Sequence, residues 1–208
     1  MKSGVIAAIA GLSALALGAG GGYVYWQSGQ DRFAACRATN VSGGVGMIGG
    51  PFELVDQHGR TVTDAEVITR PSILYFGYTF CPDVCPIDVD RNVIAVEMLQ
   101  ERGLEVQPVF ISVDPERDTP EVLERFAANM HPDMIGLTGS DEQVRAASRA
   151  YRTFFQRHDD DPDDPYYLVD HSTQSYLVMP GEGTVEVYSR TLAPGELANS
   201  MACFIENA

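Results

Sequence analysis

One stretch of the chain, Tyr75–Pro86 (YFGYTFCPDVCP), limits what this sequence can fold into more than any other. Its first half is rich in aromatic residues that suit a buried strand, and Gly77 allows the backbone to approach its neighbours closely. Its second half carries Cys81 and Cys85, each followed by a proline, directly before a segment with a helical pattern. We therefore predict a buried strand that passes through a cysteine turn into a helix.

The two cysteines of this turn are four residues apart, so a helix that starts near Cys81 would place both thiols on one face. The start of a helix stabilises thiolates through its unpaired N–H groups and its dipole. A disulfide that closes so small a loop contributes little through chain entropy, which makes a purely structural bridge a weak explanation. Two activated thiolates suit either redox chemistry or a soft metal such as Cu(I).

Hydrophobic patterns predict one domain over residues 50–208, with strands and helices in alternation. The predicted strands are a short hairpin over 51–63 and then Ser72–Thr79, Val106–Val113, Ser175–Met179 and Thr184–Tyr188. The predicted helices cover 85–102, 120–130, a segment that starts after Ser140, and 194–206. This order indicates an α/β fold in which helices flank a mixed central sheet. Because the cysteines lie where the first central strand meets its helix, the arrangement is thioredoxin-like.

Two of the predicted helices begin with recognisable capping residues. Thr119 precedes Pro120, and proline is favoured in the first turn of a helix. Ser140 with Gln143 forms a capping box. The apolar stripe of the helix after Ser140 is expected to continue inward through Phe154 and Phe155.

The N-terminal segment, residues 1–29, has the properties of a membrane anchor. Residues 3–30 contain no charged side chain, and this stretch is long enough to span a bilayer, which takes about 20 residues. Lys2 lies before the apolar stretch and Trp26 lies at its outer end, so we expect an anchor in the bacterial cytoplasmic membrane with the N-terminus in the cytoplasm and the domain in the periplasm. A cleaved signal peptide is the alternative. Residues 30–49 are small and polar and are expected to form a linker or a loosely held arm.

The formal net charge of −15 restricts the partners of the chain. Nucleic acid and anionic lipid surfaces would both repel it, so we expect no nucleic-acid partner and contact with the membrane only through the N-terminal helix. The negative charge either keeps the protein soluble or attracts a basic partner.

Among the four histidines, His171 lies just before the predicted strand Ser175–Met179, where a thioredoxin-like sheet would place it beside the cysteine turn. With two thiolates it would complete a set of two sulfurs and one nitrogen, which is appropriate to copper. A histidine at the end of a strand is more often an ordinary polar residue. The other three histidines, His58, His131 and His158, are expected at the surface.

Three further residues are candidates for supporting the cysteine turn. Asp114 and Asp118 follow the second central strand and are expected to hydrogen-bond the cysteine loop, with turn formation and capping as the simpler explanation. Tyr78 is expected to shield a bound metal, although core packing would explain it equally well.

The remaining cysteines, Cys36 and Cys203, lie before the domain and in its last helix. Outside the cytoplasm, two such cysteines are expected to pair. The disulfide would tie the arm to the terminal helix and close a long loop, where the entropic model gives the largest stabilisation. Alternatively, Cys36 is an accessory thiol that receives metal.

Three motifs occur in a specific order: FGYTFCPDVCP, ISVDPERDTP and DHSTQSYLV. Together they resemble the Sco/SenC family of copper chaperones for cytochrome c oxidase assembly. The resemblance implies a thioredoxin fold in which Cys81, Cys85 and His171 bind Cu(I) or Cu(II). It also implies copper transfer to, or thiol reduction at, the binuclear copper site of oxidase subunit II. Other periplasmic copper chaperones and thiol reductants would be further partners.

Two classes of function therefore compete: a metallochaperone, and a thiol–disulfide oxidoreductase or a redox or copper sensor of the cell envelope. Three residues separate Cys81 from Cys85, whereas thioredoxin-like redox catalysts usually have two. No proline stands immediately before Ser175, where such catalysts place one beside their cysteines. We therefore expect a metallochaperone rather than an enzyme, with disulfide reductase activity as the alternative.

Overall fold

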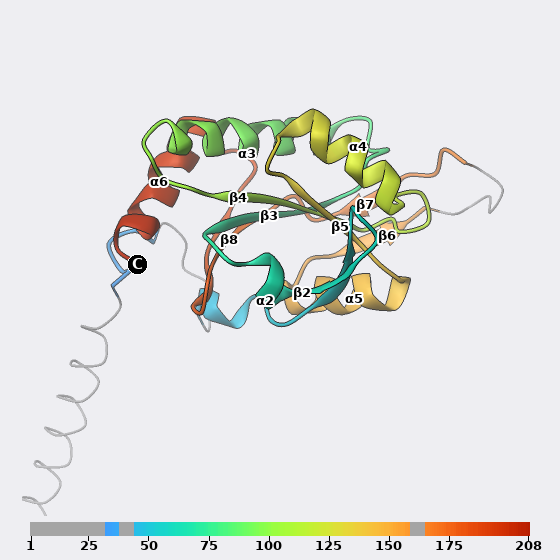
Figure 1. The fold of residues 1–208 in the computed structure, drawn as a ribbon, viewed down its shortest axis with the longest axis horizontal. Helices are drawn as coiled ribbons and strands as arrows, with labels where there is room; N and C mark the ends of the chain where they lie inside the picture. The colour runs from blue at the N-terminus through green and yellow to red at the C-terminus, as the bar shows by residue number, and fades with distance from the viewer. Residues whose placement is uncertain (1–31, 38–43, 159–164) are drawn as a thin grey trace, which may run out of the picture.

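The structure, a computed structural model, describes residues 32–37, 44–158 and 165–208. Its centre is a mixed seven-stranded sheet with the order β2-β1-β5-β4-β3-β8-β9 (Figure 1). The strands of this sheet are β1 Glu53–Asp56, β2 Thr61–Thr63, β3 Ser72–Gly77, β4 Gln107–Ser112, β5 Ile135–Thr138, β8 Ser175–Met179 and β9 Gly183–Tyr188. A separate two-stranded ribbon consists of β6 Phe155–Arg157 and β7 Val169–His171.

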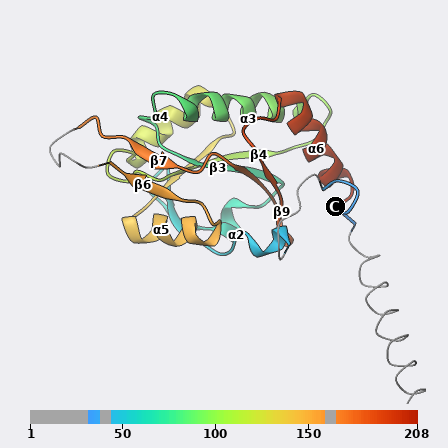
Figure 2. The ribbon, with the colours of Figure 1, turned by 180° about the vertical axis from the view of Figure 1, so that it is seen from behind.

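The helices are α2 Asp64–Val67, α3 Val84–Gln100, α4 Pro120–Met130, α5 Asp141–Ala150 and α6 Pro194–Glu206, and a 3₁₀ turn, η1, covers Val45–Met47. Helices α3 and α4 cover one face of the sheet, with α6 packed on α3, while α2 and α5 cover the other face (Figures 1 and 2). The central strands β3, β4 and β5 are parallel, whereas β1 and β8 pair with them in the antiparallel sense. Strands covered on both faces should be apolar throughout, and every residue of β3 and β4 is buried.

Most of the predicted elements are present with shifted ends. The first central strand ends at Gly77 rather than Thr79, and α6 has the predicted bounds. The Thr119 side chain accepts a hydrogen bond from the N–H of Val122, and Ser140 and Gln143 form the predicted capping box.

The predicted inward stripe after Ser140 is wrong at its end. Helix α5 stops at Ala150, and Arg152 has a positive φ of 51°, which turns the chain away from the helix axis. Phe154 is therefore 57% exposed, and Phe155 begins β6 instead of extending the helical stripe. The expectation of a surface position for His131 is also wrong, because it is 5% exposed.

The buried side chains form two hydrophobic clusters. The larger cluster, here called the cysteine-turn cluster, includes Tyr75, Phe76, Tyr78, Cys81 and Cys85. The smaller cluster, here called the staple cluster, includes the inner face of α6 and contains Phe33, Cys36 and Phe204, with Cys203 packed against it. Each cluster thus contains one pair of cysteines.

Parts of the N-terminal region expected as a linker or loose arm are packed on the domain. Phe33 is 4% exposed and lies 5.4 Å from the ring of Phe204 between centroids, and Val45 is 3% exposed. The anchor expected over residues 1–29 lies outside the described residues. Within the described segments, no helix combines the length and the apolar character needed to cross a bilayer.

Candidate metal centre

Two free thiols and one imidazole converge where β3 leads into α3. The Sγ atoms of Cys81 and Cys85 and a ring nitrogen of His171 all lie within 4.8 Å of one another. Both cysteines are buried and His171 is partly buried. The structure therefore brings together the three residues that the sequence identified as candidate metal ligands.

The local geometry of the two cysteines differs from the stacked arrangement expected for a helix that starts near Cys81. Cys81 precedes Pro82, and a residue before proline is disfavoured in the α conformation. Helix α3 begins only at Val84, so Cys85 lies in its first turn, while Cys81 lies before the helix. The N–H of Cys85 donates to the Sγ of Cys81 at 3.4 Å, so the first thiol accepts one of the free N–H groups of the helix start.

The two thiols consequently differ in acidity. Burial opposes ionisation of Cys81, but hydrogen bonds from the N–H groups of Cys85, Asp83 and Val84 outweigh it, so the pKa of Cys81 is lowered. Burial dominates at Cys85 and raises its pKa well above the ordinary thiol value. The site thus contains one thiol that ionises readily, Cys81, and one that keeps its proton unless a metal displaces it, Cys85.

His171 is the last residue of β7 and reaches the cysteines from the ribbon. Its Nδ1 lies 2.9 Å from the carbonyl oxygen of Ser172, and its Nε2 lies 3.1 Å from the Sγ of Cys85. A carbonyl only accepts, so the ring proton belongs on Nδ1, and the Nε2 lone pair faces the thiol. Burial lowers the pKa of His171, which keeps the ring neutral and ready to bind a metal at neutral pH.

Gly77 provides the space for the Cys85 thiol. A Cβ atom at this position would lie 2.9 Å from the Sγ of Cys85 and 2.9 Å from the Cε1 of Tyr75, closer than real Cβ atoms approach. The glycine noted in the sequence for close backbone approach therefore has a specific neighbour, the sulfur of the second cysteine.

Two tyrosines wall the site. The rings of Tyr75 and Tyr78 meet the His171 ring edge-on, with centroids 6.0 and 5.8 Å away. Burial raises the pKa of Tyr78 to about 12, and the nearby cysteines contribute to the shift. The Tyr75 hydroxyl donates to the buried carboxylate of Asp88 at 3.0 Å, and Asp88 also accepts from Arg190. Tyr78 thus lies where the sequence placed it, while Tyr75 and Asp88 were not identified as site residues.

The two predicted aspartates have different neighbours. Asp118 accepts from the N–H and hydroxyl of Thr79, at 3.0 and 2.5 Å, and therefore holds the strand end that leads to the cysteines. Burial raises the pKa of Asp118. Among the described residues, no hydrogen bond or ion pair joins Asp114 to the cysteine loop, contrary to expectation. Its carboxylate accepts from the Tyr167 hydroxyl at 2.6 Å and pairs with Arg117 at 2.5 Å.

Arg117, which sequence reasoning passed over, joins the cysteine turn to the segment before His171. Its guanidinium lies 3.6 Å from the ring centroid of Tyr167, 5.5 Å from that of Tyr78 and 5.0 Å from that of Phe80. Cation–π contacts of this kind are favourable when the cation is partly desolvated. An arginine between aromatic residues of two motifs is detectable in the sequence only when the fold is known.

Cys36 and Cys203 form a disulfide across 167 residues, with 5.6 Å between their Cα atoms. The predicted pairing is confirmed, and it excludes a free Cys36 thiol near the metal centre in this structure. The disulfide belongs to the staple cluster and not to the cysteine-turn cluster.

The fold is a thioredoxin-like α/β sheet. Two free cysteines and a histidine meet beyond the end of its first central strand, and this donor set suits a soft metal. Together they define a class of thioredoxin-like metal-binding proteins. The sequence matches the SCO1/SenC family over residues 42–206, and the chain belongs to this family.

Individual relatives agree with this assignment. Protein SenC of Rhodobacter capsulatus is 54% identical over 176 residues, which cover 85% of this chain and 78% of the relative. The mitochondrial SCO1 homolog 1 of Arabidopsis thaliana is 41% identical over 72% of this chain, and the match spans only 44% of that longer protein. The crystal structure of Arabidopsis thaliana ScoI with copper bound superposes with a TM-score of 0.71 at 38% identity, covering 76% of this chain and 99% of that one.

Proposed function

We propose that this protein is a membrane-tethered metallochaperone that carries copper to the binuclear copper site of cytochrome c oxidase subunit II, or reduces the thiols of that site. The observation that carries the proposal is the convergence of Cys81, Cys85 and His171. It is supported by membership of the SCO1/SenC family and by the copper in the structure of Arabidopsis ScoI.

The donor set suits copper as a transferable cargo. Thiolate sulfur is a soft ligand that selects Cu(I), and imidazole nitrogen binds both oxidation states. Cys81 offers a sulfur that ionises readily, and Cys85 gives up its proton when a metal replaces it, so copper uptake releases protons. His171 needs no deprotonation, because its Nε2 already faces the site as a lone pair.

The cellular setting belongs to the same proposal. The uncharged N-terminal segment supports an anchor in the bacterial cytoplasmic membrane, with the domain in the periplasm. The Cys36–Cys203 disulfide fits an oxidising compartment. In that compartment the cysteine pair at the site would need thiol reductants, and another copper chaperone would supply the metal.

The test is a Cu(I) titration of the reduced full chain against a competing chelator. We expect one copper per chain, and His171→Ala should weaken binding while the circular dichroism spectrum stays that of the wild type. His58→Ala is the matched control, because this histidine is exposed and lies in the turn between β1 and β2, away from the ribbon that carries His171. Unchanged affinity in His171→Ala would contradict the three-ligand site. Equal Cu(I) uptake by protein oxidised at Cys81 and Cys85 would place the metal elsewhere.

A second function, thiol–disulfide exchange, is favoured by one observation. The two thiols are unequal: the more exposed Cys81 is the more acidic, and Cys85 is buried beside it. A low-pKa attacking thiol with a buried resolving partner is the arrangement of dithiol reductants. Insulin reduction by the metal-free protein that is lost in Cys81→Ser would support this function. If the protein binds copper tightly but does not reduce insulin, the metallochaperone function stands alone.

A further inference from the structure

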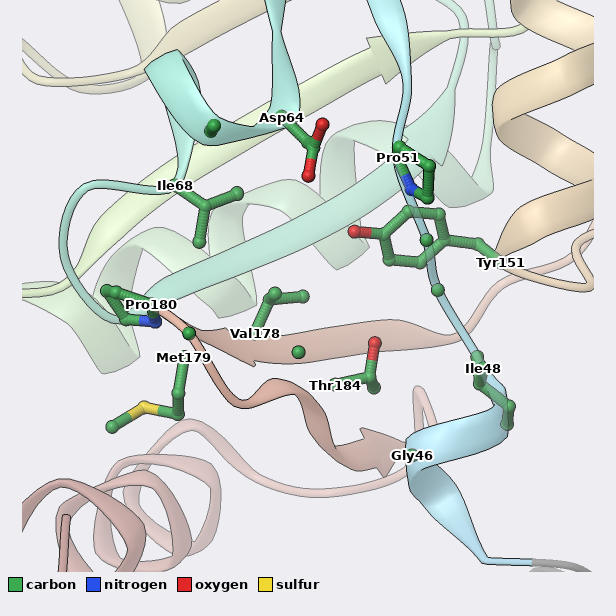
Figure 3. A pocket seen from close by; sticks show the side chains of 15 residues that line it. Gly46, Ile48, Pro51, Asp64, Ile68, Tyr151, Val178, Met179, Pro180 and Thr184 are labelled. Atoms are coloured by element: carbon green, nitrogen blue, oxygen red, sulfur yellow. The ribbon is translucent and has the colours of Figure 1, made fainter.

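A cavity of about 430 Å³ lies at the end of the sheet away from the cysteines (Figure 3). Val178 of β8 pairs with Ser72, the first residue of β3, whereas the cysteine turn follows the last residue of that strand. The walls of the cavity come from residues 46–51, the start of α2, the end of β8, the β8–β9 turn and Tyr151. No residue of the proposed metal centre lines it.

Three polar side chains at this cavity lack a hydrogen-bond partner among the described residues. The hydroxyl of Thr184 is buried and unpaired. The Tyr151 ring is 2% exposed, and its hydroxyl points into the space between Asp64, Ile68 and Val178 (Figure 3). The Asp64 carboxylate, which is half-buried, points toward the same space without an ion pair or hydrogen bond of its own (Figure 3). A buried polar group normally has a partner, so the unpaired Thr184 hydroxyl indicates a missing ligand or water, and the Tyr151 and Asp64 oxygens face the same cavity (Figure 3).

Gly49 lies against the Thr184 hydroxyl and the Tyr151 ring. A Cβ atom built on Gly49 would lie 2.6 Å from the Thr184 hydroxyl oxygen and 3.4 Å from the Cε1 of Tyr151. The φ of Gly49 is +96°, which side chains rarely adopt. A side chain here would collide with the Thr184 hydroxyl, so the glycine allows that hydroxyl and the Tyr151 ring to pack close to the backbone on this wall.

The residues that line the cavity suit a ligand with one positive charge and an apolar chain. Apart from these three groups, the lining side chains are apolar, among them Ile48, Ile68 and Val178, and no lysine, arginine or histidine is present to hold an anion. Burial and the nearby Asp64 carboxylate raise the pKa of Tyr151, so its hydroxyl stays protonated and its oxygen can accept a hydrogen bond. An ammonium group has three N–H donors, which matches the three oxygens at this cavity.

We propose that this cavity binds a small primary alkylammonium molecule, with its ammonium group donating to Asp64, Tyr151 and Thr184 and its alkyl chain lying against the apolar wall. The volume is within the range of small-molecule sites. The carboxylate supplies the charge-assisted hydrogen bond that would contribute most to affinity.

The experiment titrates hexylammonium into the reduced, metal-free full chain and follows backbone amide shifts by NMR. Shifts should centre on Gly46, Gly49 and Thr184. Asp64→Asn should weaken binding about tenfold or more, and Tyr151→Phe by a smaller factor, because one removes a charged acceptor and the other a single hydroxyl. Asp141→Asn is the matched control, since Asp141 is also the first residue of a helix with a capping box but lies outside the cavity.

Neutral and anionic analogues separate this site from general attraction to an acidic protein. Hexanol and hexanoate should bind more weakly than hexylammonium, and added salt should not abolish the localised shifts. Equal binding of all three probes would overturn the selection of a cation. Shifts spread over the acidic surface, an unchanged affinity in Asp64→Asn, or no binding at millimolar hexylammonium would overturn the site and leave water as the partner of the three groups.

Discussion

The two hydrophobic clusters use the same residue type in opposite ways. In the cysteine-turn cluster, Cys81 and Cys85 are close in sequence and remain free, with the second sulfur directed at His171. In the staple cluster, Cys36 and Cys203 are 167 residues apart and are joined.

The surroundings account for this difference. The free pair has a helix start, a neutral imidazole and a glycine that leaves space for sulfur. The bonded pair joins the N-terminal segment to α6, with apolar residues and the Asn207 amide around it. The histidine at the cysteine turn has no counterpart in the described part of that cluster. A cysteine pair thus becomes a metal site or a cross-link according to the backbone and donors around it.

The largest expected effect comes from removing a sulfur of the free pair. Cys85→Ser should lower Cu(I) affinity by more than about a hundredfold, because losing a ligand costs more than losing a residue that only orients one. Chelator competition measures this change. The double variant Cys36→Ser/Cys203→Ser is the control and should keep its affinity within about twofold, since distant sites act independently. A comparable loss in the control would contradict the separation of the two clusters.

Removing the staple should act on stability instead. We expect Cys36→Ser/Cys203→Ser to lower the free energy of unfolding by about 2–5 kcal/mol, because the reduced unfolded chain regains the freedom of a long loop. Urea denaturation measures the loss, and wild-type protein with this disulfide reduced should match the variant. An unfolding free energy equal to that of the oxidised wild type would show that apolar packing around Phe33 and Phe204 is sufficient.

A single methyl group at the base of the metal centre should have a moderate effect. Gly77→Ala is expected to lower copper affinity about tenfold, in the range found for residues that orient ligands, because the new Cβ pushes the Cys85 sulfur aside. Gly195→Ala in the staple region is the matched control, where the added Cβ would meet only Met98 at an ordinary 3.7 Å. If both variants bind copper like the wild type, the sulfur has more room than the structure shows.

The smallest expected effect is a difference in pH dependence between the two free thiols. The lowered pKa of Cys81 means that its thiolate forms below pH 9.0, the ordinary thiol value, while burial keeps Cys85 protonated above it. As pH rises from neutrality, alkylation of the metal-free protein should therefore begin at Cys81 and reach Cys85 later. Peptide mass mapping of iodoacetamide-treated protein measures both rates, and prior labelling of Cys85 would contradict the asymmetry.

Local patterns predicted much of the fold because they reflect local forces. The Thr119–Pro120 start of α4 and the bounds of α6 follow from capping and helical periodicity. Strand β5 was missed, because its Gly136 and the following Gly139 are typical of a loop. Its place comes from pairing with β4 and β1, which are distant in sequence.

The site shows the same division between local and distant information. Cys81, Cys85 and His171 could be identified because their residue types suit a soft metal. The roles of Asp114 and Arg117 could not, since they depend on Tyr167, which lies about 50 residues away in the chain. The ribbon that carries His171 was also missed, because β6 and β7 are three residues each.

The position of His171 on this ribbon has a consequence for how a metal would leave. Cys81 lies in the turn between β3 and α3, and Cys85 lies in the first turn of α3. His171 belongs to β7, which pairs with β6 and is not a strand of the main sheet. A copper ion held by all three residues would be a cross-link between two separately paired units. A small movement of the ribbon away from the cysteines would remove the His171 ligand while the two sulfurs still bound the ion. Under the proposed copper transfer, an acceptor would then replace the remaining ligands one bond at a time.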